Sequence, residues 1–168
     1  MPTPAASFKP DDMSPVSPHL ICRGAADAID FYVKAFGAVE RRRTEASNGK
    51  IMNAVIEFEG ASIMLVDENL DYGMKGPLAY DGSPVSLHVY VPDVDDFVTR
   101  AEQAGGTIIM PAADQFWGDR FAMMRDPFGH VWSFATHKFI PTPEELKAGA
   151  MAEAGSGDGC ANFQKKEA

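Results

Sequence analysis

One pattern of strands and a helix occurs twice in this chain, and this internal repeat limits the possible folds more than any other feature. Each copy predicts a short strand, then a helix ended by a glycine (Gly37 or Gly105), then three further strands. One helix can cover only one face of the sheet in such a βαβββ module. The other face must therefore be covered elsewhere or form a cavity with the second copy.

The first module is predicted over residues 18–67. Its helix is indicated by apolar residues at helical spacing, from Ala25 to Phe36, and its last two strands meet at a tight Glu59-Gly60 turn. The expected elements are strands at 19–23, 39–45, 51–58 and 61–66 and a helix at 25–36.

The second module is predicted over residues 85–136, after a linker at 68–84 that contains several Gly and Pro residues without a clear period. Asp93 is the expected N-cap of its helix. The expected elements are strands at 85–91, 107–110, 120–124 and 130–135 and a helix at 93–104.

Both ends of the chain differ in composition from the two modules. Residues 1–17 are rich in Pro, Ser and Ala, which predicts a flexible N-terminal segment. Residues 137–168 form a C-terminal tail with one short helix. The helix begins at Thr142-Pro143-Glu144-Glu145, which has the form of a capping box, and extends to about Glu153.

Charge and cysteine content exclude some classes of partner. The chain has 24 acidic and 15 basic residues, a net charge of −9, so a nucleic-acid partner is not expected. No stretch has the length and apolarity of a membrane span, so no membrane partner is expected either. Cys22 in an apolar run and Cys160 in a Gly-rich tail do not suggest a disulfide. We therefore expect a cytoplasmic protein.

Alternation along the strands predicts two different sheet faces. Leu87 and Val89 point to one face of the strand at 85–91, and Ser86, His88 and Tyr90 point to the other. The first face is a core face. The second mixes polar and apolar side chains, as the wall of a small-molecule pocket does.

Two motifs in these modules resemble a known family. They are A-I-D-F-Y-V-K-A-F-G in the first helix and R-D-P-F-G-H-V-W before the last strand. With D-Q-F-W-G-D-R and W-S-F-A-T-H, they resemble the vicinal oxygen chelate superfamily (glyoxalase, bleomycin resistance and dioxygenase proteins), PhnB-like branch, from Pro18 to Glu145. The resemblance implies an α+β fold in which two paired βαβββ modules form an incomplete barrel around a cavity, commonly in a homodimer.

The resemblance also locates the positions where metal-dependent members carry their metal ligands. These positions correspond here to Ser17, Met64, Ser86 and Ser133. A serine hydroxyl or a thioether is a poor ligand for a divalent metal. We therefore expect neither the metal site of the superfamily nor a cofactor.

His19 and His88 each lie two residues beyond one of these positions, so alternation places both on the cavity face. Asn53 can point the same way. Our interpretation is that these histidines are part of the pocket wall. The alternative is a displaced metal site that uses both of them.

The loop Gln115 to Arg120 contains two aromatic side chains beside an amide, an acid and a base. It could close over the pocket, with the aromatic rings stacking on a planar ligand. Alternatively, Phe116 and Trp117 plug the barrel mouth and Asp119 pairs with Arg120. The complete set predicted to line the pocket is His19, Asn53, Met64, Ser86, His88, Tyr90, Gln115, Phe116, Trp117, Arg120 and Ser133.

The predicted function is binding of a small organic molecule in the cavity between the modules. One alternative is a metal-dependent lyase, isomerase or dioxygenase of the same superfamily, and another is a structural or regulatory module without a ligand. The fold does not choose among these, so whether the chain is an enzyme stays open.

Overall fold

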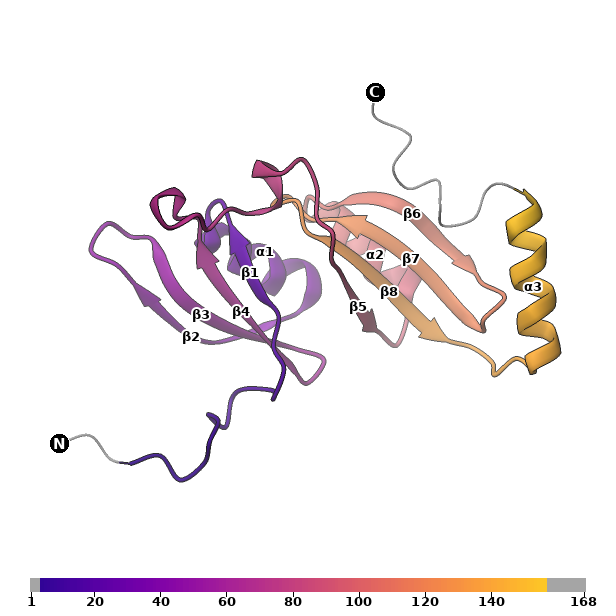
Figure 1. The fold of residues 1–168 in the computed structure, drawn as a ribbon, viewed down its shortest axis with the longest axis horizontal. Coiled ribbons are helices and arrows are strands. Elements are labelled where there is room, and N and C mark those ends of the chain that lie inside the picture. Colours follow the sequence, from indigo (N-terminus) through magenta and orange to yellow (C-terminus); the bar gives the residue numbers. More distant parts are fainter. Residues whose placement is uncertain (1–3, 157–168) are drawn as a thin grey trace.

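The computed structural model describes residues 4–156 and arranges most of them in two four-stranded sheets, with α1 and α2 on the same side (Figure 1). In the first sheet the strand order is β1-β4-β3-β2, where β1 pairs with β4 in parallel and the other pairs are antiparallel. The elements of this module are β1 (His19–Cys22), α1 (Ala25–Phe36), β2 (Val39–Glu45), β3 (Ile51–Phe58) and β4 (Ala61–Asp67).

The second module repeats this topology with the order β5-β8-β7-β6 and the same pattern of pairing. Its elements are β5 (Ser86–Tyr90), α2 (Val94–Gln103), β6 (Thr107–Asp114), β7 (Asp119–Arg125) and β8 (Val131–His137). The predicted α+β fold of two βαβββ modules is confirmed, and over the described residues the two sheets do not close into a barrel. Strand β6 extends beyond the expected range because irregularities in its register break the alternation around Met110.

The last strand of each module caps the helix of that module. Asp67 Oδ1, at the end of β4, accepts hydrogen bonds from the backbone N–H groups of Gly24 (3.1 Å) and Ala25 (3.0 Å) at the start of α1. At the corresponding end of β8, Thr136 Oγ1 accepts from the N–H of Val94 (2.9 Å) at the start of α2. These side chains satisfy amides that a helix leaves without intrahelical partners, and so fix each helix to its sheet.

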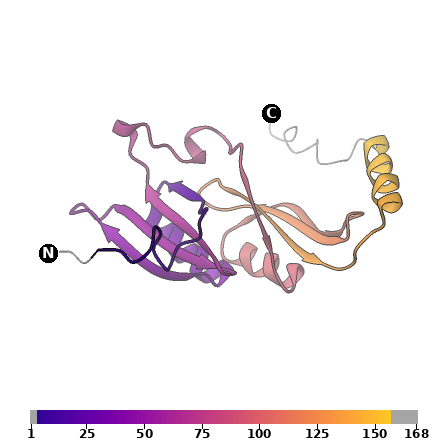
Figure 2. The same cartoon turned by 60° about the horizontal axis from the view of Figure 1, so that its bottom comes forward.

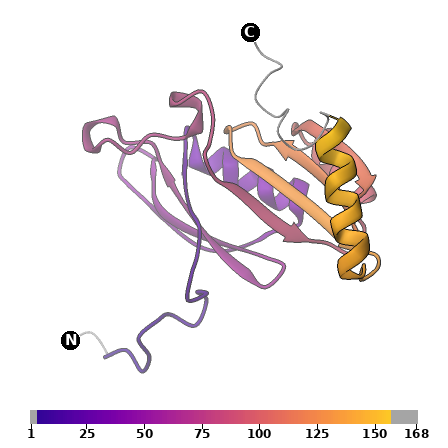
Figure 3. The same ribbon diagram turned by 45° about the vertical axis from the view of Figure 1, so that its right-hand side comes forward.

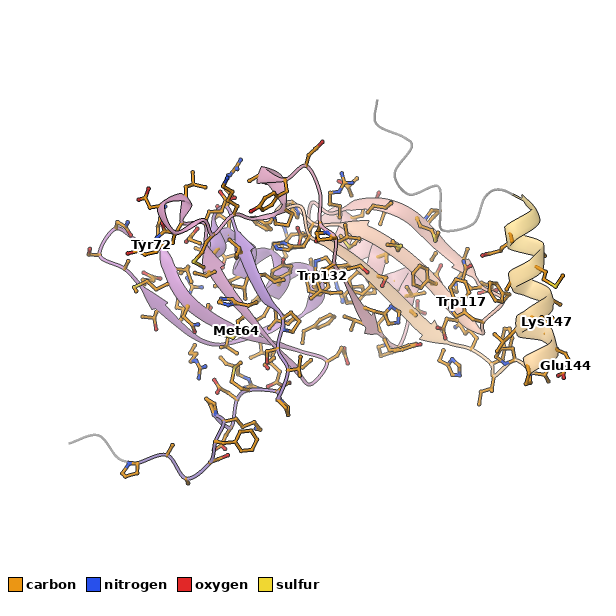
Figure 4. The ribbon with its side chains drawn as sticks, viewed as in Figure 1. Met64, Tyr72, Trp117, Trp132, Glu144 and Lys147 are labelled. Atoms are coloured by element: carbon orange, nitrogen blue, oxygen red, sulfur yellow. The ribbon has the colours of Figure 1, made fainter. Side chains whose placement is uncertain are left out.

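The two modules share one core, which is built largely from aromatic rings. Phe36 of α1 lies 5.4 Å from the ring of Phe97 in α2 and 5.0 Å from that of Trp132 in β8, measured between ring centroids. Figure 4 shows Trp132 in the middle of the molecule, between the two sheets. Because these rings come from both copies, neither module buries its apolar face alone.

A buried carboxylate at Asp126 also joins the modules. Its Oδ2 accepts hydrogen bonds from the Tyr32 hydroxyl of α1 (2.6 Å) and from Trp132 Nε1 (2.9 Å), and its Oδ1 accepts from the backbone N–H groups of Phe128 and His130 (both 2.9 Å). A buried charge needs such partners. The D-P-F-G-H-V-W motif therefore provides an inter-module connection as well as a turn.

The N-terminal segment lies against the first sheet. The N–H of Ser14 donates to Ser62 Oγ (2.7 Å), the N–H of Ser62 donates to Ser14 Oγ (3.2 Å), and Arg42 forms an ion pair with Asp12. These contacts cover part of the face opposite α1.

The linker from β4 to β5 contains two short 3₁₀ helices, η1 (Leu70–Tyr72) and η2 (Pro77–Ala79), and bridges the two sheets along one side (Figure 2). Gly76 passes so close to β1 that a Cβ atom there would lie 2.5 Å from the carbonyl oxygen of Ile21. This close approach requires glycine at position 76.

The last helix, α3 (Pro143–Ser156), lies at the far end of the second sheet, away from the first (Figures 1 and 3). Its predicted capping box is formed, with the N–H of Thr142 donating to Glu145 Oε2 and the N–H of Glu145 donating to Thr142 Oγ1. A Cβ atom at Gly149 would meet the ring of Phe116, so the helix packs on the β6–β7 turn at this glycine. None of the helices between residues 4 and 156 has the length and apolarity needed to cross a membrane.

Candidate functional site

A cleft of about 890 Å³ lies between β1 of the first module and β5 of the second. Both are edge strands of their sheets, so the cleft runs along two strand edges and receives side chains from both faces of each strand. The linker before β5 and the β3–β4 turn complete its wall. Its lining includes His19, Phe58, Ile63, Tyr80, Ser86, His88 and Tyr90.

The two histidines of the cleft occupy corresponding positions in the repeat. His19 in β1 is opposite Met64 of β4, and His88 in β5 is opposite Ser133 of β8. His88 Nδ1 is 2.8 Å from Ser133 Oγ, and its ring contacts Tyr90 edge-on and stacks on Phe121. His88 is nevertheless exposed, so it is held in position without being part of the core.

The walls of the cleft combine apolar and polar groups. Phe58, Ile63 and Leu87 provide apolar surface from the core side of the sheets, while the histidines, Ser86 and Tyr90 provide hydrogen-bonding groups. Small-molecule sites typically have a volume of about 300–1,000 Å³, mainly apolar walls and a few polar groups. The cleft has these properties.

Tyr90 joins the cleft to a hydrogen-bonded cluster on the outer face of the second sheet. Its hydroxyl donates to Asp119 Oδ2 (3.1 Å) in β7, and Asp119 Oδ1 is 2.8 Å from Nδ1 of His137 in β8. The hydrogen bond to Asp119 raises the pKa of Tyr90, so the phenol remains a donor at neutral pH.

Four of the residues predicted for the pocket line the cleft: His19, Ser86, His88 and Tyr90. Ser133 lies behind His88 as its hydrogen-bond partner. The others predicted for the pocket are outside the residues that line this cleft: Asn53, Met64, Gln115, Phe116, Trp117 and Arg120.

The loop Gln115 to Arg120 lies at the α3 end of the second sheet, and Figure 4 places Trp117 there, well away from Met64 in the first sheet. Phe116 packs on α3, and Trp117 packs edge-on against Phe121. Arg120 forms ion pairs with Asp95 of α2 and Asp114 of β6. The Asp119–Arg120 pair considered from the sequence is not formed, because these neighbours in β7 point to opposite faces of the sheet.

Several lining residues were not predicted, and six of them come from the linker. Tyr80 and Val85, together with the Gly82-Ser83-Pro84 turn, line the cleft just before β5 begins. The chain topology could have predicted these residues, because a linker that joins the end of β4 to β5 must pass the gap between the edge strands. His130 of the turn before β8 is a further lining residue that was not predicted. It is buried, and its Nδ1 lies 3.5 Å from Asp126 Oδ2.

The residues at the superfamily's metal-ligand positions do not fit a divalent metal. Ser17 Oγ is hydrogen-bonded to Ser62 Oγ (2.5 Å), Ser133 Oγ is paired with His88, and Met64 offers only a thioether. Between residues 4 and 156, moreover, no three His, Cys, Asp or Glu side chains are grouped as metal ligands.

Comparisons with known proteins bear on the family and the fold. The model of the Glyoxalase/Bleomycin resistance protein/Dioxygenase superfamily matches residues 15–134. An uncharacterized protein of Mycobacterium tuberculosis, Rv0887c, is 42% identical over 145 residues, which cover 84% of this chain and 85% of that protein.

Two solved structures show the same fold. TioX from Micromonospora sp. ML1 has a TM-score of 0.59 and 28% identity, covering 74% of this chain and 98% of that one. A PhnB protein from Bacillus cereus has a TM-score of 0.59 and 19% identity, covering 73% and 99%. The resemblance that the sequence motifs indicated is confirmed.

Proposed function

The chain belongs to the glyoxalase/bleomycin resistance protein/dioxygenase superfamily, and on this premise we propose that it binds a small organic molecule in the cleft between β1 and β5. Membership alone does not choose a function, because one fold can support several. The observation that carries the proposal is the cleft itself, in which corresponding histidines of both modules face a space large enough for a small molecule.

The mainly apolar side chains that line the cleft, with a few polar groups among them, favour an apolar ligand with a few polar substituents. The surface of Phe58 and Ile63 contributes hydrophobic binding energy of about 25 cal/mol for each Å² that a ligand covers. His19 and His88 lie on the two sides of the cleft, so both can hydrogen-bond to one ligand. We propose that binding uses these groups without a metal, since the superfamily's ligand positions carry unsuitable side chains.

Binding can be tested with a fluorescent naphthalene sulfonate as the probe and two variants of the cleft. His88→Ala should weaken probe binding about tenfold, the effect of losing one hydrogen bond of roughly 0.5–3 kcal/mol. Ser86→Trp should prevent binding by filling the cleft. Because His88 and Ser86 are exposed, both variants should keep nearly wild-type urea midpoints.

Tyr72→Ala is the control, since it changes an exposed aromatic residue outside the cleft. Unchanged probe binding in both cleft variants would refute the proposal. A large loss of stability in His88→Ala with unchanged binding would show a purely structural role for this histidine.

We further propose that the chain acts as a homodimer in the cytoplasm. Each sheet has two unpaired edge strands over the described residues, and Val85 and Tyr90, which line the cleft, expose apolar surface that a second copy could cover. The buried free thiol of Cys22 is consistent with a reducing compartment.

A further inference from the structure

The outer face of the second sheet carries an aspartate, a histidine and a tyrosine joined by hydrogen bonds. Asp119 accepts from the Tyr90 hydroxyl at 3.1 Å and is 2.8 Å from His137 Nδ1. The three residues come from β7, β5 and β8 and meet through the strand register, in which Asp119 is opposite His137 and Tyr90 is opposite Ala135. Because the side chain of Ala135 is small, the ring of Tyr90 can reach across β8 to Asp119.

The carboxylate determines which nitrogen of His137 carries the proton. A carboxylate only accepts hydrogen bonds, so Nδ1 of His137 must be the donor. The neutral ring then has its lone pair on Nε2, which no residue between 4 and 156 occupies with a hydrogen bond. The side chain of Asp119 is 7% exposed and that of His137 is 52% exposed, so a nearly buried acid orients a base that solvent or a ligand can reach.

Aromatic rings line the surface on the same face. Phe121 is two residues from Asp119 in β7 and is also opposite Ala135. The ring centroid of Trp117 lies 5.7 Å from that of Phe121, in an edge-on arrangement, and His88 stacks on Phe121 at 6.0 Å. A planar ring can therefore lie on an aromatic surface beside the base.

We propose that His137, positioned by Asp119, accepts a proton from the hydroxyl group of a phenolic ligand bound on this face. In this step the O–H bond of the phenol breaks, its electron pair stays on oxygen, and the new N–H bond forms at Nε2. The carboxylate of Asp119 stabilises the resulting imidazolium. The inference shares Tyr90 with the cleft but does not depend on what the cleft binds.

The test uses the full chain and para-nitrophenol, whose phenolate is yellow and whose neutral form is nearly colourless. At a pH slightly below the pKa of the free phenol, wild-type protein should increase the yellow absorbance, and equilibrium dialysis should show bound phenol. In His137→Asn the increase should fall about tenfold. The asparagine amide can still donate to Asp119, so this change removes the base while keeping the hydrogen bond that holds the site together.

Two further variants separate the possible explanations. Asp119→Asn should also reduce the yellow signal. The amide N–H can donate to Nδ1 and so stabilise the other tautomer of His137, and the amide has no negative charge to stabilise an imidazolium. If Asp119→Asn fails to fold, His137→Asn alone decides the question. The matched change His19→Asn tests the cleft. If His19→Asn loses the yellow signal and His137→Asn keeps it, the phenol binds in the cleft and the inference is overturned. An unchanged signal in His137→Asn would also overturn the inference, as would a wild-type protein that does not bind the phenol.

Discussion

Because Tyr32 donates a hydrogen bond to the buried carboxylate of Asp126, removing the tyrosine hydroxyl should lower the free energy of unfolding. Tyr32→Phe keeps the ring, which is 0% exposed, but removes the hydroxyl that donates to the carboxylate at 2.6 Å. No cavity of ring size forms, so the loss is mainly one hydrogen bond to a buried charge, about 1.5–3 kcal/mol. Trp132 Nε1 still donates to the same oxygen and limits the effect. We therefore expect the free energy of unfolding to fall by about 2 kcal/mol.

Urea unfolding, followed by tryptophan fluorescence, measures this loss as a lower midpoint at an unchanged m-value. Tyr72→Phe is the matched control: its ring is 82% exposed, and the change should cost less than about 0.5 kcal/mol. A Tyr32→Phe variant as stable as this control would refute the inter-module hydrogen bond as a source of stability.

The pH dependence provides a second check. Burial, followed by the charge of Asp126, raises the pKa of Tyr32 well above its ordinary value. The protonated tyrosine therefore contributes stability that is fully present below the unfolded pKa of about 10 and is lost as the pH rises further. The difference in stability between wild type and Tyr32→Phe should accordingly narrow above about pH 10. A difference that widens there would contradict the sign of the shift.

Three other predictions concern the capping, the thiol and the assembly. Asp67→Ala should lower the free energy of unfolding by about 1–2 kcal/mol because it removes the acceptor for the first amides of α1. Asp67→Asn keeps an acceptor oxygen and should lower it by less. Equal losses in the two variants would contradict capping of α1. Burial raises the pKa of the Cys22 thiol, so in Cys160→Ser a disulfide reagent should react with Cys22 only after unfolding, and rapid reaction of the native protein would show that the thiol is accessible. Sedimentation at micromolar concentration should show a dimer, and a monomer alone would refute the proposed assembly.

The sequence by itself determined the repeated architecture. Apolar spacing defines α1, and Gly37 and Gly105, both with positive φ, end the helical segments where the pattern predicts. Alternation also assigned His88 and Tyr90 to one face of β5, and in the structure their rings are in edge-on contact. These features depend on local preferences and on the periodicity within one strand or helix. Residues 1–3 and 157–168, including Cys160, lie outside the described part of the chain.

Only the tertiary structure decided which side chains meet. Arg120, expected in the pocket, pairs with Asp95 of α2 because its position in β7 directs it to the helix side of the sheet. His137 could not be interpreted from the sequence, because its contact with Asp119 depends on the register between β7 and β8. Tyr80 lines the cleft because the linker passes between two edge strands. Periodicity fixes the face on which a side chain lies, but its neighbours from distant strands depend on register and on the packing of the modules.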